Sequence, residues 1–450
     1  MSRWSSSCAL LVAVCPLMPA AAAEVDPDPE VARVVAAVDD QRLMATVTRL
    51  AAFGTRNLYS GTGSATRGTG AARAWIADEL RKASPRMQVL LDRHRLAAQG
   101  GRLATEVDLV NVVGVLPGRS ARRIIVSGHY DSVAKGPDGQ IHWDQGDLPA
   151  PGANDDGSGT AAVLEMARLL GSESLEATVV FVAFDGEEEG LVGSSLYAER
   201  AARQHEPIFA VLNNDIIGSE EGGSGRVGNT TVNVYSNGPN DSISRELALY
   251  VEWIGERFVP VMDVRPIFRY DRFGRGGDHT PFDQKGFAAI RFTVSEENYE
   301  RQHDLRDSPD GVSARYLGRV ARVNAAALTS LALAPPTPVV TDDKGRPLLD
   351  RGESGYDARL RWELPEAPPD LAGFEILMRD TTSSRWEKTW LLPAGAREKT
   401  LPGVLIDTVT LGVRSVDRDG NRSLAGVYSY PPREMKEYQI RPQAPVGSGR

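Results

Sequence analysis

Residues 178–189 read TVVFVAFDGEEE, an apolar run that ends in a cluster of acids. The apolar part, 178–184, predicts a strand that is buried on both faces, as in a parallel sheet covered by helices. Glu187 and Glu188 follow at the end of this strand, where buried carboxylates are costly unless a cation compensates them. A solvated turn is the ordinary alternative for an acidic run. The stretch therefore predicts a buried strand and, if its acids are buried, a cation beside them.

Other polar groups follow apolar runs in the same way. His129 and Asp215 each come within three residues of the end of a predicted strand, Asp155 lies in a glycine-rich turn before a predicted helix, and His303 comes much later. Taken singly, His129 fits a hydrogen-bonded core residue and Asp155 a helix cap. Ligands of parallel sheets bind at the carboxyl ends of the strands. Together these residues predict one site at that edge.

The residue types favour metal chemistry. Zinc binds histidine nitrogen and carboxylate oxygen, and a catalytic zinc keeps one position open for water. The candidate ligands are His129, Asp155, Glu188, Asp215 and His303. Two divalent cations against three carboxylates and two neutral histidines leave one positive charge, which can polarise a carbonyl and acidify a bridging water.

Neighbouring residues suggest a division of roles. Asp155 suits a bridge between two ions, because a carboxylate has two oxygens and the flanking glycines let the backbone approach closely. Glu187 and Glu188 should point in opposite directions on leaving the strand, so that one binds metal and the other faces the water as general base.

Two more aspartates could orient the histidines. Asp131 lies two residues after His129 and can accept the second ring N–H, which fixes the tautomer; a plain turn residue is the alternative. Asp307, four residues after His303, is expected to do the same there.

Strands and helices alternate along residues 110–333, which predicts an α/β fold: a mostly parallel mixed sheet with helices on both faces. One helix is expected at about 31–53. The segment 334–338, APPTP, reads as a stiff linker. Short strands beyond it predict a small all-β sandwich. The expected units are a signal peptide (1–23), an α/β domain (24–334), a β-sandwich (335–435) and a flexible tail (436–450).

Five short motifs occur in order: GHYDS (128–132), GANDDGSG (152–159), EEEGLVGS (187–194), NDIIG (214–218) and HDLRD (303–307). This series resembles the M28 family of zinc peptidases, over roughly 31–333. The resemblance implies a zinc-peptidase type of fold and an aminopeptidase that hydrolyses the first peptide bond of a peptide with two zinc ions.

The resemblance also assigns roles. It places His129 and Asp215 on one zinc, Glu188 and His303 on the other, and Asp155 on both. Glu187 would be the general base, with Asp131 as a second catalytic-site residue, and the Asp155–Asp156 peptide would be cis. The segment 277–282, GDHTPF, resembles a family segment in which His279 is structural. Some relatives carry a tyrosine just before the last histidine to hold the oxyanion; Gln302 stands there, so that role is left to the metals.

A second resemblance concerns the C-terminal part. Trp362, the run 374–376 and the strand-and-turn segment 413–421 resemble a fibronectin type III domain. Contact with a surface or polymer is one expected role for it.

The net charge and the N-terminal segment limit the class of partner and the compartment of the protein. The net charge of −9 offers no basic surplus for nucleic acid. Arg3, the apolar run 9–14 and the alanines 21–23 indicate a signal peptide cleaved near Ala23, and hence a secreted or periplasmic protein. Both cysteines lie inside that segment, so the mature chain must rely on its core and on bound metal. No other run reaches the length of a membrane span.

Two other functions fit parts of the pattern. A glutaminyl-cyclase-like acyltransferase of the same fold would use one zinc and lack one histidine, which the presence of His129 disfavours. A non-catalytic binding ectodomain is disfavoured by the complete ligand set together with Glu187.

Overall fold

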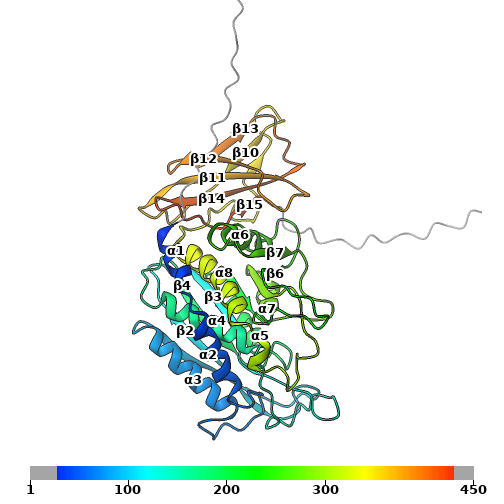
Figure 1. The fold of residues 1–450 in the computed structure, drawn as a ribbon. Coiled ribbons are helices and arrows are strands. Elements are labelled where there is room, and N and C mark those ends of the chain that lie inside the picture. The colour runs from blue at the N-terminus through cyan, green and yellow to red at the C-terminus, as the bar shows by residue number, and fades with distance from the viewer. Residues whose placement is uncertain (1–27, 430–450) are drawn as a thin grey trace, which may run out of the picture.

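The structure, a computed structural model, describes residues 28–429. The predicted signal peptide and tail lie outside these residues. The described chain forms a large α/β part and, next to helix α6, a smaller all-β part (Figure 1).

An eight-stranded mixed sheet lies at the centre of the α/β part, in the order β1-β2-β4-β3-β5-β8-β6-β7. Its strands are β1 (Gln88–Leu96), β2 (Val107–Leu116), β3 (Arg123–His129), β4 (Thr178–Phe184), β5 (Ile208–Asn214), β6 (Thr231–Ser236), β7 (Asp263–Ile267) and β8 (Ala289–Val294). The central strands β4, β3, β5 and β8 pair in parallel, whereas β2 joins β4 and β6 joins β8 in antiparallel fashion. The predicted mostly parallel mixed sheet is confirmed.

Helices cover both faces of this sheet, as expected. One face carries α1 (Pro29–Ala36), α2 (Asp40–Ala51), α3 (Gly68–Ala83), α4 (Gly157–Leu170), α6 (Ile243–Phe258) and α8 (Ala314–Leu333); the other carries α5 (Val192–Arg203) and α7 (His279–Gln284). A short 3-10 helix, η1, spans Pro309–Gly311. Strand β4 is wholly buried because its side chains alternate between the two cores: Phe181 packs in the first, Val182 and Phe184 in the second.

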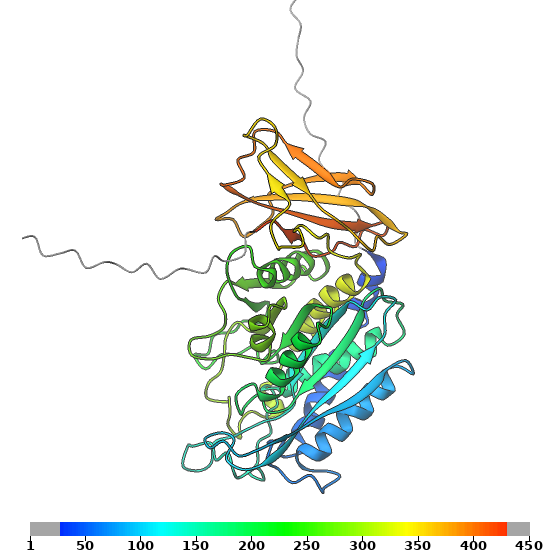
Figure 2. The same cartoon turned by 180° about the vertical axis from the view of Figure 1, so that it is seen from behind.

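Two local predictions were wrong or incomplete. The single helix expected at 31–53 is two helices, because Asp39 caps α2 by accepting backbone hydrogen bonds from Gln41 (2.9 Å) and Arg42 (3.1 Å). Strand β1 was not anticipated: it lies at the edge of the sheet (Figure 2). It is half exposed and has a charged centre, Asp92 to Arg95, so its hydrophobic pattern is weak.

The C-terminal part consists of two antiparallel sheets. One contains β9 (Leu349–Asp350), β10 (Ala358–Arg361) and β13 (Glu398–Leu401); the other contains β11 (Leu371–Asp380), β12 (Lys388–Pro393), β14 (Val409–Asp417) and β15 (Gly426–Val427). Trp362 and Phe374 lie in their common core, with ring centroids 5.4 Å apart. The expected all-β class is confirmed, and the likeness to a fibronectin type III domain stays a prediction.

Among residues 28–429, no helix is both long and apolar enough to cross a bilayer.

Candidate metal centre

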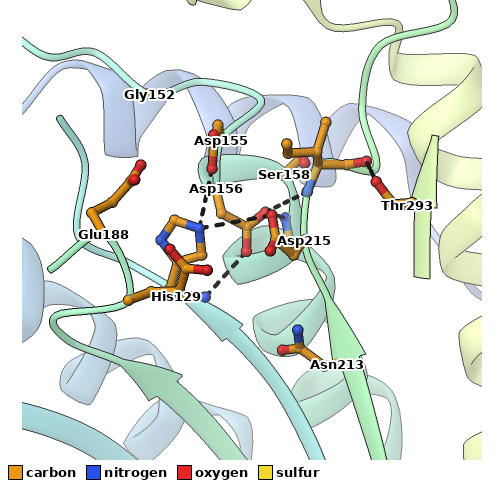
Figure 3. Close-up of polar contacts among 12 residues, drawn as sticks. His129, Gly152, Asp155, Asp156, Ser158, Glu188, Asn213, Asp215 and Thr293 are labelled. Carbon is orange, nitrogen blue, oxygen red and sulfur yellow. Dashed lines mark hydrogen bonds and ion pairs between the residues drawn. The ribbon is translucent and has the colours of Figure 1, made fainter. Parts of the chain in front are cut away.

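The predicted ligands meet at one edge of the sheet because parallel strands end there together. His129 ends β3 and pairs in register with Phe184 at the end of β4, which is followed by the acidic turn. Asp215 follows the last residue of β5, the next strand. Figure 3 shows Asp155, Glu188 and Asp215 around the ring of His129. The carboxyl ends of β3, β4 and β5 thus form the floor of the site.

Asp155 presents one oxygen to each histidine. Its Oδ1 lies 3.1 Å from His129 Nε2, and its Oδ2 lies 3.2 Å from His303 Nε2. The same atom of His129 is 3.8 Å from Asp215 Oδ1, and that of His303 is 3.0 Å from Glu188 Oε2. Two of the three groups of possible ligands among the described residues, His129–Asp155–Asp215 and Asp155–Glu188–His303, share Asp155; the third is His129–Glu187–Glu188.

These residues fit a pair of zinc ions. Two ligand atoms that each lie about 2.0–2.1 Å from a tetrahedral ion are about 3.3 Å apart, close to most of the separations seen here. The donors are imidazole nitrogens and carboxylate oxygens, which zinc prefers. Glu188 Oε1 is buried without a hydrogen-bond partner, as expected for an atom that awaits a cation.

The pKa shifts of the site residues also indicate that the cluster carries excess negative charge. Burial raises the pKa of Glu187 well above its ordinary value; His129 opposes this, while Asp215 and Glu188 add to it. Burial lowers the pKa of His303, but Glu188 and Asp155 outweigh it and raise that pKa to about 11. The cluster attracts protons in place of a metal.

Glu187 and Glu188 lie less far apart than expected, because their carboxylates form a further possible ligand group with His129. Only Glu188 also joins Asp155 and His303, and it is buried, whereas Glu187 is partly buried. Both line a cavity of about 400 Å³ above the site, and the division of their roles stays a prediction. The alternative of a solvated turn does not apply to Glu188, which is 4% exposed.

Asp131 orients both sides of the site. Its Oδ1 lies 3.4 Å from His129 Nδ1, and its carboxylate accepts the backbone N–H groups of Glu187 (3.3 Å) and Glu188 (3.1 Å). It is completely buried, so it fixes the histidine ring and the acidic turn together.

The role expected for Asp307 was wrong. Its two oxygens accept hydrogen bonds from the backbone N–H groups of Asn154 (2.8 Å) and Asp155 (3.0 Å). It therefore holds the Asp155 turn and does not orient the ring of His303.

Of the two adjacent aspartates, Asp155 is the candidate metal ligand and Asp156 is the helix cap. The peptide bond joining them is cis, as the family resemblance implied. Asp156 caps α4 by accepting a hydrogen bond from the N–H of Gly159 at 2.8 Å, and its other oxygen accepts the N–H of His129 at 3.1 Å. His279 Nε2 lies 3.1 Å from the carbonyl of Tyr270, and His279 belongs to none of the three ligand groups, in line with a structural role.

Arg291 was missed by the sequence analysis. This fully buried arginine lies in the middle of β8 and places Nη2 3.1 Å from Asp215 Oδ2, while Nη1 lies 3.1 Å from Asp271. Burial lowers its pKa, but the two aspartates outweigh this and raise it, so the guanidinium stays charged. Arg291 thus holds one oxygen of Asp215 and leaves the other toward His129. An arginine inside the apolar run AIRFTV (289–294) was the available signal.

Gln302 also contacts the site. Its Nε2 donates a 2.9 Å hydrogen bond to Asp155 Oδ2, which fixes the orientation of that carboxylate. Tyr299 is 61% exposed, and its ring lies near the guanidinium of Arg275, 5.8 Å from the ring centroid.

Comparison with known proteins gives the family. Peptidase family M28 matches residues 111–328, which include all five candidate ligands. A probable zinc metalloprotease of Leptosphaeria maculans is 36% identical over 90% of this chain and 98% of its own length, and one of Pyricularia oryzae is 36% identical over 89% and 84%.

Solved structures support the fold. The LapA aminopeptidase of Legionella pneumophila superposes with a TM-score of 0.54 at 18% identity, covering 70% of this chain and 78% of that one. A glutaminyl cyclase of Bacteroides thetaiotaomicron gives 0.52 at 17% identity, covering 65% and 98%. At these identities the likeness concerns the fold alone. The sequence identity to relatives along nearly the whole chain, with the five candidate ligands inside the matched segment, shows that the chain belongs to peptidase family M28.

Proposed function

We propose that this protein is a zinc-dependent aminopeptidase that binds two zinc ions and removes the first residue of a peptide. The observation that carries the proposal is the arrangement of Asp155, whose two oxygens each face one histidine. His129 and Asp215 would complete one site, and Glu188 and His303 the other. The names of the curated relatives, probable zinc metalloproteases, agree with zinc as the metal.

The residues around the metals have separate tasks in this reaction. Bound zinc would polarise the scissile carbonyl and lower the pKa of a water. Glu187, which lines the cavity, takes the proton of that water and passes it to the leaving amine. Asp131 holds His129 and the turn that carries Glu187. Arg291 holds Asp215 in the same way. These contacts keep the ligands preorganised, so little reorganisation is needed during the reaction.

Glutaminyl cyclases are the second candidate, because one of them shares the fold at a TM-score of 0.52. Two ligand groups that share Asp155 favour the peptidase. One bound zinc per chain, together with cyclisation of an N-terminal glutamine, would favour the cyclase.

The decisive experiment compares Glu187→Gln with the wild type. The zinc-loaded wild type should hydrolyse peptides with a free amine and leave N-acetylated ones intact, and elemental analysis should give two zinc ions per chain. Glu187→Gln should keep both ions and lose turnover by about 10²-fold or more, because it cannot accept a proton. Glu199→Gln, which removes an exposed carboxylate on α5, is the matched control. Substantial turnover by Glu187→Gln would exclude Glu187 as the base.

We also propose that the protein is exported after cleavage near Ala23. Mass spectrometry of the N-terminus of protein recovered from the periplasm or the medium tests this. An intact Met1 on that material would contradict it.

A further inference from the structure

The cavity above the metal centre carries charges that the proposed reaction does not use. Four carboxylates and His303 face the metal centre, and every other charged side chain that lines the cavity is an arginine. These are Arg102, Arg272 and Arg275, which we call the arginine wall. A cavity of about 400 Å³ falls in the range of small-molecule sites, so the wall must lie close to any bound substrate.

Arg272 is the anchored member of the wall. Its side chain is 8% exposed and donates hydrogen bonds to Asp271 (2.9 Å), Glu297 (3.0 Å) and the carbonyl of Gly276 (3.3 Å). Its donors are therefore used inside the protein, and it stiffens the loop between β7 and α7.

Arg275 has donors to spare. Its Nη1 donates to Glu297 Oε2 at 3.1 Å, the same oxygen that Arg272 uses, and its side chain remains 31% exposed. A guanidinium has five N–H donors, so most of those of Arg275 are available to a ligand. One carboxylate shared by two arginines leaves positive charge on the cavity side.

Arg102 belongs to a different segment of the chain, the connection between β1 and β2. Its Nη1 donates a 2.7 Å hydrogen bond to the carbonyl of Glu188, and its guanidinium packs over the ring of Trp143 at 4.9 Å from the centroid. These two contacts hold the guanidinium beside a candidate metal ligand. Within residues 28–429 its side chain contacts a neutral carbonyl and an aromatic face, so no described carboxylate pairs with its charge.

The chemistry that such a wall recognises is a carboxylate. The planar fork of arginine matches the two oxygens of a carboxylate, and such charge-assisted pairs are the strong hydrogen bonds of proteins. A cationic side chain would meet repulsion here, and an apolar one would leave the spare donors unpaired.

We infer that the arginine wall, through Arg275 and Arg102, binds a carboxylate of the substrate close to the scissile bond. The inference rests on the proposed function, since it takes the scissile carbonyl to lie at the metal centre. In a dipeptide the terminal carboxylate meets this requirement, and in a longer peptide an acidic side chain does. The preferred substrates are then dipeptides or peptides with an acidic residue next to the cleaved bond.

The test compares substrates that differ in one carboxylate. We would measure kcat/KM for alanyl-leucine against alanyl-leucine amide, and for aspartyl-leucine amide against asparaginyl-leucine amide, with zinc-loaded wild type, Arg275→Gln and Arg102→Gln. Arg269→Gln is the matched control, because Arg269 lies in the same loop as Arg275 but does not line the metal cavity. The wild type should prefer the carboxylate member of at least one pair by about tenfold or more. Arg275→Gln should reduce this ratio mainly through KM, Arg275→Lys should restore part of it, and Arg269→Gln should keep it.

The two pairs of substrates also locate the carboxylate. Preference within the first pair assigns the wall to the terminal carboxylate, and preference within the second assigns it to a side chain of the first residue. Equal rates within both pairs would overturn the inference. A preference that survives in both Arg275→Gln and Arg102→Gln would overturn it as well.

Binding separates this inference from the proposed reaction. Calorimetry with zinc-loaded Glu187→Gln should show tighter binding of alanyl-leucine or aspartyl-leucine amide than of its neutral partner. That result, together with a wild type that cleaves none of the four compounds, would refute the aminopeptidase proposal and support the arginine wall. Equal binding within both pairs would refute the wall.

Discussion

Arg379 provides the sharpest stability prediction, because it joins the two parts of the molecule. It lies in β11, is fully buried, and places Nη2 2.9 Å from Glu246 Oε1 on α6. The same guanidinium donates 2.8 Å hydrogen bonds to the carbonyls of Asn240 and Ser383. Trp386 donates to the other oxygen of Glu246 at 3.2 Å. A buried ion pair thus connects the β-part to the α/β part.

The variant Arg379→Met should lose about 5–7 kcal/mol of unfolding free energy. Removal of one partner of a buried pair costs about 3–5 kcal/mol, because Glu246 must then either stay charged without a partner or take up a proton. Two lost hydrogen bonds to carbonyls add about 1 kcal/mol each. The double variant Arg379→Met/Glu246→Met leaves no charge behind and should lose only about 2–3 kcal/mol, the cost of the unpaired carbonyls and of Trp386.

Urea unfolding at pH 8 would measure both variants. Burial, opposed by Arg379, raises the pKa of Glu246 to about 7, so this carboxyl is ionised at pH 8. Tryptophan fluorescence suits the assay because Trp253 and Trp386 line a cavity at this contact. Arg359→Met, which breaks a largely exposed pair with Glu398, is the control and should change stability little. The reasoning fails if Arg379→Met costs less than about 1 kcal/mol, or if the double variant is no more stable than the single one.

Three further outcomes follow from buried charges. Arg291→Met should destabilise the metal-free protein by about 3–5 kcal/mol and the zinc-loaded protein by less, because zinc compensates the charge of Asp215 while Asp271 remains paired with Arg272. Thermal melts with and without zinc measure the two losses of stability, and equal losses would contradict the prediction. The folded-state pKa of Glu246, about 7, exceeds its ordinary 4.5, so the folded state binds a proton more tightly than the unfolded state does. Its contribution to the free energy of unfolding is full below pH 4.5, and about 3 kcal/mol of it is lost as the pH rises through 7. Urea titrations at pH 5 and 8 should show this loss in the wild type and not in Glu246→Gln. A chelator should lower the melting temperature and zinc should restore it, since removal of metal leaves the carboxylates uncompensated; an unchanged melting curve would exclude tightly bound metal.

The parts of the fold that follow from sequence are those with a strong local pattern. Strand β4 is a short apolar run followed at once by acidic residues, and its predicted limits, 178–184, agree with the observed ones. Strand β1 carries charged residues along a half-exposed edge, so its order depends on pairing with β2 and leaves little trace in the hydrophobic pattern. The break at Asp39 depends on a single side-chain cap inside an otherwise helical pattern.

The candidate site likewise contains residues that local sequence motifs predict and residues whose contacts they do not predict. The five candidate ligands carry local signals, because each sits in a short motif and most of these follow a strand end. Asp307 and Arg291 act across the fold: one holds the backbone of Asp155 from a residue 152 positions away, and the other reaches Asp215 from 76 positions away. Spacing along the chain placed Asp307 near His303, but the path of the backbone sends its carboxylate to a different partner. Contacts of this kind follow only from the tertiary structure.

Arg56 shows why the segment before the matched family region belongs to the catalytic unit. It lies in the stretch 54–70, which reads as a plain glycine-rich loop, yet its side chain is fully buried. Its guanidinium donates to the carbonyls of Tyr130 (2.5 Å), Pro151 (2.6 Å) and Gly152 (2.8 Å). The first of these residues follows His129, and the other two begin the turn that carries Asp155. One arginine therefore fixes the spacing between the two ligand-bearing loops, and it offsets part of the negative charge beneath them. Because residues 111–328 do not include it, that region alone would lack the clamp that brings His129 and Asp155 together.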